Sequence, residues 1–339
     1  MVTRQRKRLS LLGGWIGLVL VLQGYSCPMG EGSPVRAGDR DGEIRVGTLR
    51  RVYHLHIPPS YDGAVPVPLV LVFHGLLETS GEMVGLTGFS HLADQKGFIV
   101  VYPDSIGRHW NDGRGTTALA PRDVDDVGFV AALIEHLKDT LAIDPTRIYA
   151  TGMSNGGMFV QRLACELSGQ LAAIGPVSGT MAKNIATQCT PQQRVSVVEF
   201  HGTKDAFVTW DGGSVRALGG KVLSVPNTMT RWTQLDGCHS TPPATFDDFA
   251  REPRNALGVR RVAYGPCPEG IDVVLYVIGG GRHHWPHRIG GHLVSMGRGN
   301  QGIDATEAMW DFFARHPKRT PGTPTKRFPG EPLIIKGFL

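Results

Sequence analysis

The segment 152–156 constrains the fold of this chain more than any other, because it has the pattern G-x-S-x-G around Ser154. It directly follows the apolar run 147–151, and residues 158–167 after it carry apolar side chains at helical spacing. In a sharp turn between a strand and a helix, such glycines let the two elements approach closely and leave the serine hydroxyl exposed. The pattern therefore predicts a nucleophilic serine, although an ordinary glycine-rich turn is an alternative.

Short apolar segments alternate with helical patterns along most of the chain, which is typical of a largely parallel sheet with helices on both faces. With 339 residues, of which 41% are hydrophobic, we expect one large domain rather than two. The expected strands lie within residues 46–57, as one or two strands, and at 67–73, 97–102, 147–151, 171–177, 195–200 and 273–278. The expected helices are residues 123–141, 158–167 and 302–316.

The first 26 residues have the pattern of a signal peptide, which predicts that the protein is exported. Basic residues precede an apolar stretch that is too short to span a bilayer comfortably. Cys27 follows, and two interpretations stay open: cleavage with secretion, or acylation of Cys27 as in a bacterial lipoprotein anchored to a membrane. Both place the mature protein in the periplasm, outside the cell or on a membrane. We expect residues 27–44 to be flexible, residues 45–317 to form the catalytic domain, and residues 318–339 to be a proline-rich basic tail.

The net charge of +5 does not indicate a nucleic-acid partner, because it is concentrated at the two ends of the chain. Residues 1–26 and residues 318–339 carry +4 each, which leaves −3 for residues 27–317. A domain that binds phosphate backbones needs a basic face, and this balance does not supply one.

Four cysteines follow Cys27, and an even number in an exported protein favours disulfides. Three connectivities are possible. We expect Cys238–Cys267 and Cys165–Cys189, because both pairs are local along the chain. The absence of a C-x-x-C spacing argues against a thiolate zinc site.

A serine nucleophile needs a histidine base, and the base needs a carboxylate that fixes its tautomer. In this topology the carboxylate and then the histidine follow the serine, each in a loop after a later strand. Asp205 lies just after a buried strand and is preferred to Asp211 because it is closer to the strand end, with a turn-capping role as the alternative. His283 and His284 follow three glycines after the last strand, and either could be the base.

Acyl transfer also needs hydrogen-bond donors for the oxyanion that forms on the carbonyl oxygen. The backbone N–H of Asn155, directly after the nucleophile, is one candidate. The second is the backbone N–H of Leu76, in the loop after the strand 67–73. Neither donor depends on its side chain.

A metal site is the alternative interpretation of the histidine-rich segment, with His283, His284, His287 and His292 as ligands. No carboxylate or cysteine accompanies these histidines at a regular ligand spacing. We therefore expect no metal, and hydrolysis by a serine nucleophile with a histidine base needs no cofactor.

Several short motifs occur in a fixed order, namely His74-Gly75, Tyr102-Pro103-Asp104, Trp110-Asn111-Asp112, the segments 124–129 and 152–158, His201-Gly202-Thr203-Lys204-Asp205, and 281–286. Over residues 45–317 this set resembles the polyhydroxybutyrate depolymerase and feruloyl esterase family of α/β hydrolases. The resemblance implies an α/β-hydrolase fold and a secreted or lipid-anchored esterase. It suggests polyhydroxyalkanoate oligomers, feruloyl or acetyl sugar esters, or simple aliphatic esters as substrates.

The family's last motif usually has the sequence Gly-Gly-Gly-His-x-Trp-Pro, and this chain has the extra residue Arg282 after the glycines. Counting back from Trp285 places the catalytic imidazole at His283, with His284 as the second choice. The resemblance also implies a Cys238–Cys267 disulfide.

Trp110 and Asn111 correspond to residues that lie near the substrate in the family, and Trp285 is a third candidate substrate contact. An aromatic ring and an amide at this edge of the sheet could stack on a substrate ring or bind an ester oxygen. A tryptophan that only packs its loop against the domain is an equal alternative for Trp110.

The sequence as a whole predicts an exported serine carboxylesterase with Ser154 as nucleophile, His283 as base and Asp205 as the orienting acid. An acyl-enzyme would form and then be hydrolysed by water. Two alternatives stay open: cleavage of amides by the same triad, or a cell-surface binding lipoprotein on an inactive hydrolase scaffold. The oligomeric state and the identity of the ester are not predicted.

Overall fold

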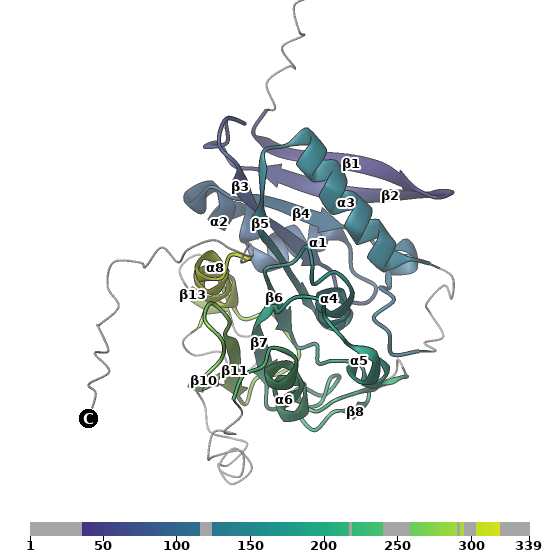
Figure 1. The fold of residues 1–339 in the computed structure, drawn as a ribbon, viewed down its shortest axis with the longest axis vertical. Helices are drawn as coiled ribbons and strands as arrows, with labels where there is room; N and C mark the ends of the chain where they lie inside the picture. The colour runs from purple at the N-terminus through teal and green to yellow at the C-terminus, as the bar shows by residue number, and fades with distance from the viewer. Residues whose placement is uncertain are drawn as a thin grey trace, which may run out of the picture. The chain divides into compact units, whose positions relative to one another are not determined.

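The computed structural model describes residues 36–115, 124–216, 219–239, 258–289, 292–294 and 303–318. Within them a nine-stranded sheet has the order β1-β2-β4-β3-β5-β6-β7-β11-β10 (Figure 1). The strands from β4 to β11 run parallel, and β1, β2 and β10 are antiparallel to their neighbours. The bounds are β1 Gly38–Val46, β2 Leu49–Ile57, β3 Val67–Phe73, β4 Ile99–Pro103, β5 Ile143–Met153, β6 Ala173–Val177, β7 Ser196–Gly202, β10 Gly258–Tyr264 and β11 Val273–Gly279.

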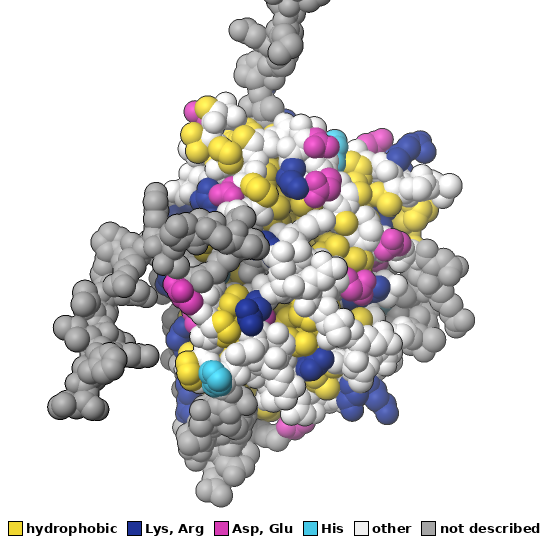
Figure 2. Space-filling view, viewed as in Figure 1, with side chains coloured by type: hydrophobic (Ala, Val, Ile, Leu, Met, Phe, Trp, Pro, Cys, Tyr) yellow, Lys and Arg dark blue, Asp and Glu magenta, His cyan; other side chains and the backbone are white. Residues whose placement is uncertain are grey.

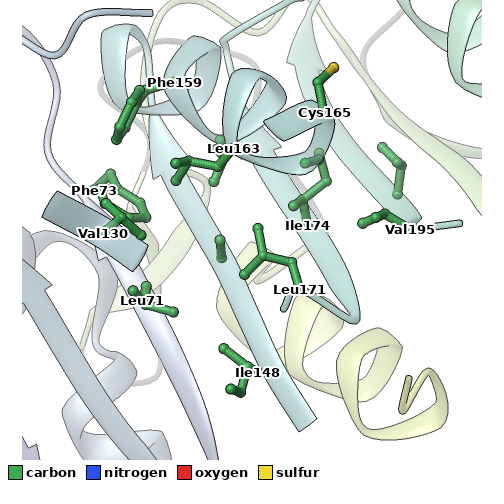
Figure 3. Close-up of a cluster of buried hydrophobic side chains, with 14 of the residues drawn as sticks. Leu71, Phe73, Val130, Ile148, Phe159, Leu163, Cys165, Leu171, Ile174 and Val195 are labelled. Carbon is green, nitrogen blue, oxygen red and sulfur yellow. The ribbon is translucent and has the colours of Figure 1, made fainter. Parts of the chain in front are cut away.

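Helices cover both faces of this sheet, as the alternating pattern predicts. On one face α3, α4 and α6 pack on strand residues such as Leu71, Ile148 and Ile174 (Figure 3). On the other face α1, α2 and α8 pack on the alternate residues of the same strands, such as Val70 and Tyr149. Because successive strand residues point to opposite faces, strands covered on both sides are apolar throughout. The bounds are α1 Ser80–Thr87, α2 Phe89–Lys96, α3 Asp126–Thr140, α4 Asn155–Glu166, α5 Lys183–Gln188, α6 Val225–Leu235 and α8 Ala305–Arg315.

Three small elements complete the described residues. A 3-10 turn, η1, spans Ile106–Arg108. Two short hairpins pair β8 (Gly213–Ser214) with β9 (Lys221–Val222), and β12 (His287–Ile289) with β13 (His292–Val294).

The boundaries of the folded region differ from those expected. Strand β1 begins at Gly38, inside the segment 27–44 that was expected to be flexible. Lys318, expected in the tail, is held by the domain: its Nζ donates to the carbonyl oxygens of Ser168 and Leu171. The expected signal peptide, Cys27 and residues 319–339 lie outside the described residues.

Two disulfides are present: Cys165 on α4 is bonded to Cys189 at the end of α5, and Cys238 after α6 is bonded to Cys267 after β10. No helix in the described ranges is long and apolar enough to cross a membrane. On the face drawn in Figure 2, acidic and basic side chains are interspersed rather than gathered by sign.

Candidate active site

Ser154 sits on the turn between β5 and α4. Its backbone has φ 57° and ψ −117°, a conformation that residues with side chains rarely adopt. The Ser154 N–H donates to the Val177 carbonyl on β6 at 2.9 Å, which fixes the turn against the next strand. From Ile148 to Gln161 every residue except Ser154 is buried. The turn therefore presents one hydroxyl at the carboxyl edge of the sheet.

The two glycines of the pentapeptide are required by close backbone contacts. A Cβ atom on Gly152 would lie 2.7 Å from the Phe73 carbonyl oxygen, and one on Gly156 would lie 2.3 Å from the same atom. A Cβ on Gly156 would also lie 2.5 Å from the His74 carbonyl oxygen. The turn thus packs directly on the loop after β3, which contains Leu76.

Asp205 and His283 are brought together by the loops after β7 and β11. The distance between His283 Nδ1 and Asp205 Oδ2 is 2.7 Å. The other oxygen of Asp205 accepts the N–H groups of Phe207 and Val208, both at 2.9 Å. Burial alone raises the pKa of Asp205, but the hydrogen bond and positive charge of His283 outweigh it, so this pKa lies below its ordinary value. A carboxylate on the Nδ1 side leaves Nε2 of His283 as the basic nitrogen.

His284 does not share this arrangement. Its two ring nitrogens are buried and have no hydrogen-bond partner among the described residues. The geometry therefore joins His283, rather than His284, to Asp205. No hydrogen bond links Ser154 Oγ to His283 in the structure, and such bonds often tighten only when substrate is bound.

The loop after β3 is braced by the segment around η1. His74 Nδ1 lies 2.7 Å from the Gly75 carbonyl oxygen, and its Nε2 lies 3.1 Å from both the N–H and the hydroxyl of Ser105. Burial lowers the pKa of His74, which keeps the ring neutral as these contacts require. Among the described residues, the backbone N–H groups of Leu76 and Asn155 donate no hydrogen bond. Both expected oxyanion donors are thus available.

Two of the expected substrate contacts are corrected by the structure, because both tryptophans are core residues. Trp110 is 0% exposed, stacks on Phe159 and donates from Nε1 to the His74 carbonyl oxygen. Trp285 is 2% exposed and donates from Nε1 to Thr306 Oγ1. Neither ring is open to a ligand.

Asn111 remains half-buried, with its main chain held at both ends. Its N–H donates to Asp126 Oδ2, and its carbonyl oxygen accepts from Arg162, each at 2.8 Å. The side chain is the one expected polar contact that stays partly accessible.

Two exposed apolar side chains that the sequence analysis did not single out border the site. Phe207, two residues after Asp205, is 50% exposed, and its ring centroid lies 5.2 Å from that of His283. Leu77, next to Leu76, is 58% exposed. Their only sequence signal is an apolar residue beside a predicted site residue.

No group of three or more metal-ligand side chains occurs in the part of the chain that the structure describes. The side chains of His287 and His292 lie outside that part.

Comparison of the sequence with those of known proteins gives three findings. Residues 51–196 match the family model "Esterase PHB depolymerase". The chain is 28% identical over 235 residues to feruloyl esterase B of Piromyces equi, covering 67% of this chain and 41% of that protein. It is 30% identical over 256 residues to "Putative esterase NocK" of Nocardia uniformis subsp. tsuyamanensis, covering 72% and 73% of the two chains. The chain therefore spans less than half of the feruloyl esterase.

Among solved structures, the acetyl xylan esterase from Aspergillus awamori superposes with a TM-score of 0.54 at 14% identity. The match covers 81% of this chain and 99% of that chain. This similarity, with the strand order and the two helical layers, confirms the expected α/β-hydrolase fold.

Proposed function

The chain belongs to the PHB depolymerase and feruloyl esterase family of carboxylic ester hydrolases, and we propose that it cleaves its ester with a Ser154–His283–Asp205 triad. The observation that carries the proposal is the 2.7 Å contact between His283 Nδ1 and Asp205 Oδ2. It pairs the imidazole with an ionised carboxylate at the same sheet edge as Ser154, which is only partly buried.

The first half of the reaction makes an acyl-enzyme. With its Nδ1–H donated to Asp205, His283 takes the Ser154 proton at Nε2 while Oγ attacks the ester carbonyl. The backbone N–H groups of Leu76 and Asn155 bind the oxyanion. The protonated imidazole then gives its proton to the leaving alcohol, and the acyl group stays on Ser154.

The second half repeats these steps with water. His283 takes a proton from water, the resulting hydroxide attacks the acyl-enzyme, and Ser154 regains its proton when the carboxylic acid leaves. All proton transfers use His283, so these steps need no cofactor.

Export is part of the proposal. It is supported by the basic and apolar start of the chain and by two disulfides, which persist in oxidising compartments. A more specific proposal is that Cys27 is acylated and anchors the protein to a membrane. The mass of the mature N-terminal peptide distinguishes anchoring from secretion, because an unmodified Cys27 rules out the lipid anchor.

The substrate class follows from the relatives. Curated relatives include a feruloyl esterase and a bifunctional acetylxylan esterase/xylanase. We propose that the substrates are feruloyl or acetyl sugar esters or polyhydroxyalkanoate oligomers. Measuring kcat/KM for acetyl, feruloyl and hydroxybutyryl esters ranks these candidates.

The test is Ser154→Ala against p-nitrophenyl acetate. We expect kcat to fall by about 10⁴-fold or more, because the nucleophile is lost. Ser178→Ala is the matched control, since Ser178 follows the neighbouring strand β6, also with positive φ, and should keep its activity. Full activity of Ser154→Ala would contradict the proposal.

A further inference from the structure

Strand β7 carries two ionisable side chains that have no role in the proposed mechanism. Glu199 and His201 alternate with Val198 and Phe200, so they point to the face that α4 and α6 cover. Both side chains are fully buried. Their partners on β11, Leu275 and Val277, are buried apolar residues of the same face.

Glu199 is fixed by residues from two helices. Gln161 on α4 donates from Nε2 to Glu199 Oε2 at 3.3 Å and to the Gly179 carbonyl oxygen at 3.1 Å. Trp232 on α6 donates from Nε1 to Gln161 Oε1 at 2.5 Å. The carboxyl group is therefore held from one side by a hydrogen-bonded chain that begins in α6.

His201 links this chain to the triad carboxylate. Its Nδ1 lies 3.3 Å from Glu199 Oε1, and its Nε2 lies 2.9 Å from the Val208 carbonyl oxygen. The Val208 N–H is one of the two donors to Asp205 Oδ1. His201 Nε2 also lies 3.7 Å from Asp205 Oδ2. The ring thus contacts both ends of the turn that holds Asp205.

These contacts define where the protons are. A carbonyl oxygen only accepts, so His201 Nε2 carries a hydrogen. One further proton then lies between His201 Nδ1 and Glu199 Oε1, and burial raises the pKa of Glu199 so that this proton is retained. The pair is neutral overall whichever atom binds the proton. The other groups that face it are Asp205, the Trp210 ring beside His201, and Tyr264 near Glu199.

A structural role alone does not explain this pair. Replacing a buried ion pair by apolar residues of similar volume is often neutral or stabilising, and the partners of this pair on the neighbouring strand β11 are apolar. What distinguishes the pair is its place behind the carboxylate that orients the proposed base.

We propose that Glu199 and His201 are positioning residues for Asp205. This inference rests on the proposed function. His201 holds the Val208 carbonyl and so the turn whose N–H groups bind Asp205, and Glu199 holds His201 in the form that carries a proton on Nε2. Through Asp205 the pair sets the orientation of the His283 ring.

The test compares His201→Leu, which removes the donor, with His201→Gln, whose Nε2 can still donate to Val208. The matched control is His316→Leu. His316 is also a buried histidine bound to a carbonyl oxygen and a carboxylate, those of Phe312 and Asp272, but it lies at the opposite sheet edge.

In His201→Leu we expect kcat to fall by about 10- to 100-fold with little change in KM, which is the effect of misplacing a catalytic group. The acidic limb of the kcat/KM profile should move to lower pH, because a looser Asp205 stabilises protonated His283 less. His201→Gln should restore most of kcat and the wild-type profile. His316→Leu should leave both unchanged.

The proposal is overturned if His201→Leu keeps the wild-type kcat, if its loss is matched by His316→Leu, or if the pH profile does not move. Should His201→Leu fail to fold, ¹⁵N NMR of the histidines in the wild-type enzyme still decides. A His201 Nε2 that carries its proton across the active pH range supports the proposal, and an unprotonated Nε2 contradicts it.

Ser154→Ala, measured in parallel, separates the two claims. If Ser154→Ala abolishes activity while His201→Leu does not change it, only the positioning role fails. If Ser154→Ala retains activity, the proposed function and the positioning role both fail.

Discussion

At the scale of single residues, we expect Phe207 both to hold Asp205 in place and to influence which substrate binds. Its N–H binds Asp205, the residue is half exposed, and its ring lies beside that of His283. In the proposed mechanism His283 protonates the leaving alcohol, so a ring next to His283 lies on the leaving-group side. The exposed face can contact a leaving alcohol that is aromatic or has the flat apolar face of a sugar.

Phe207→Ala should therefore lower kcat/KM for p-nitrophenyl acetate by about tenfold, while ethyl acetate, which offers little surface to the ring, is hardly affected. The main-chain bond to Asp205 is retained in this variant. Val65→Ala is the control, because Val65 is 66% exposed and lies outside the loops that build the site. An equal loss for both esters would mean that Phe207 acts through Asp205 rather than on the leaving group.

The position of Ser154, Asp205 and His283 at one sheet edge could be predicted. Each residue follows an apolar strand, and the loops after parallel strands meet at one edge of the sheet. The position of a tryptophan ring could not be predicted in this way. Trp110 fits either substrate binding or packing, and its burial depends on Phe159, far along the chain. Glu199 was missed because a charged residue inside an apolar strand gives no periodic signal.

At the scale of elements, backbone contacts leave no room for an added side chain where β5, α4 and the loop after β3 meet. The atoms that a Cβ on Gly156 would meet belong to the backbone of Phe73 and His74, so they cannot move aside at low cost. This contact also holds the Leu76 loop against the Ser154 turn.

Gly156→Ala should destabilise the protein by about 1–3 kcal/mol and lower kcat, because α4 must move away from that loop. For Gly85→Ala in α1 we expect the opposite effect, a more stable protein. A Cβ there would meet nothing within 4 Å, and alanine is the better helix former by about 0.5–1 kcal/mol. Urea unfolding of both variants checks the pair; a Gly156→Ala protein as stable as the wild type would contradict the close approach.

The central strands of the sheet could be predicted from their continuous apolar runs, whereas the edge of the sheet could not. Strand β1 has mostly polar residues and half-buried alternate positions, and it forms because β2 offers a partner. Helices α1 and α2 are short and carry few apolar residues at regular spacing. Their positions follow from packing on Val70 and Val72, which a single sequence does not show.

At the scale of the whole molecule, one buried carboxyl couples stability to pH. Asp236 follows α6 and is 0% exposed; its Oδ1 accepts the Val195 N–H, and its Oδ2 is buried with no hydrogen-bond partner in the part of the chain that the structure describes. Burial raises the pKa of Asp236 to about 7. In the unfolded chain an Asp has a pKa of about 3.9. Between these two values the folded state keeps a proton that the unfolded state has lost.

The contribution of Asp236 to stability is therefore complete below about pH 4 and declines by about 1.4 kcal/mol per pH unit up to the folded-state pKa. Asp236→Asn stays neutral and keeps the acceptor for Val195. We expect it to match the wild type near pH 4 and to exceed it by a few kcal/mol at pH 8, a difference that urea unfolding at both pH values measures. The same stability difference at both pH values would contradict a protonated Asp236.

The most direct test of the central claim is labelling with a fluorophosphonate probe, followed by peptide mass spectrometry. The probe forms a covalent bond only with an activated nucleophile, so it reports on the whole Ser154–His283–Asp205 arrangement rather than on the serine alone. We predict one adduct, on Ser154, that is lost in Ser154→Ala and greatly slowed in His283→Ala. An unlabelled Ser154, or an adduct only on another residue, would contradict the proposed triad.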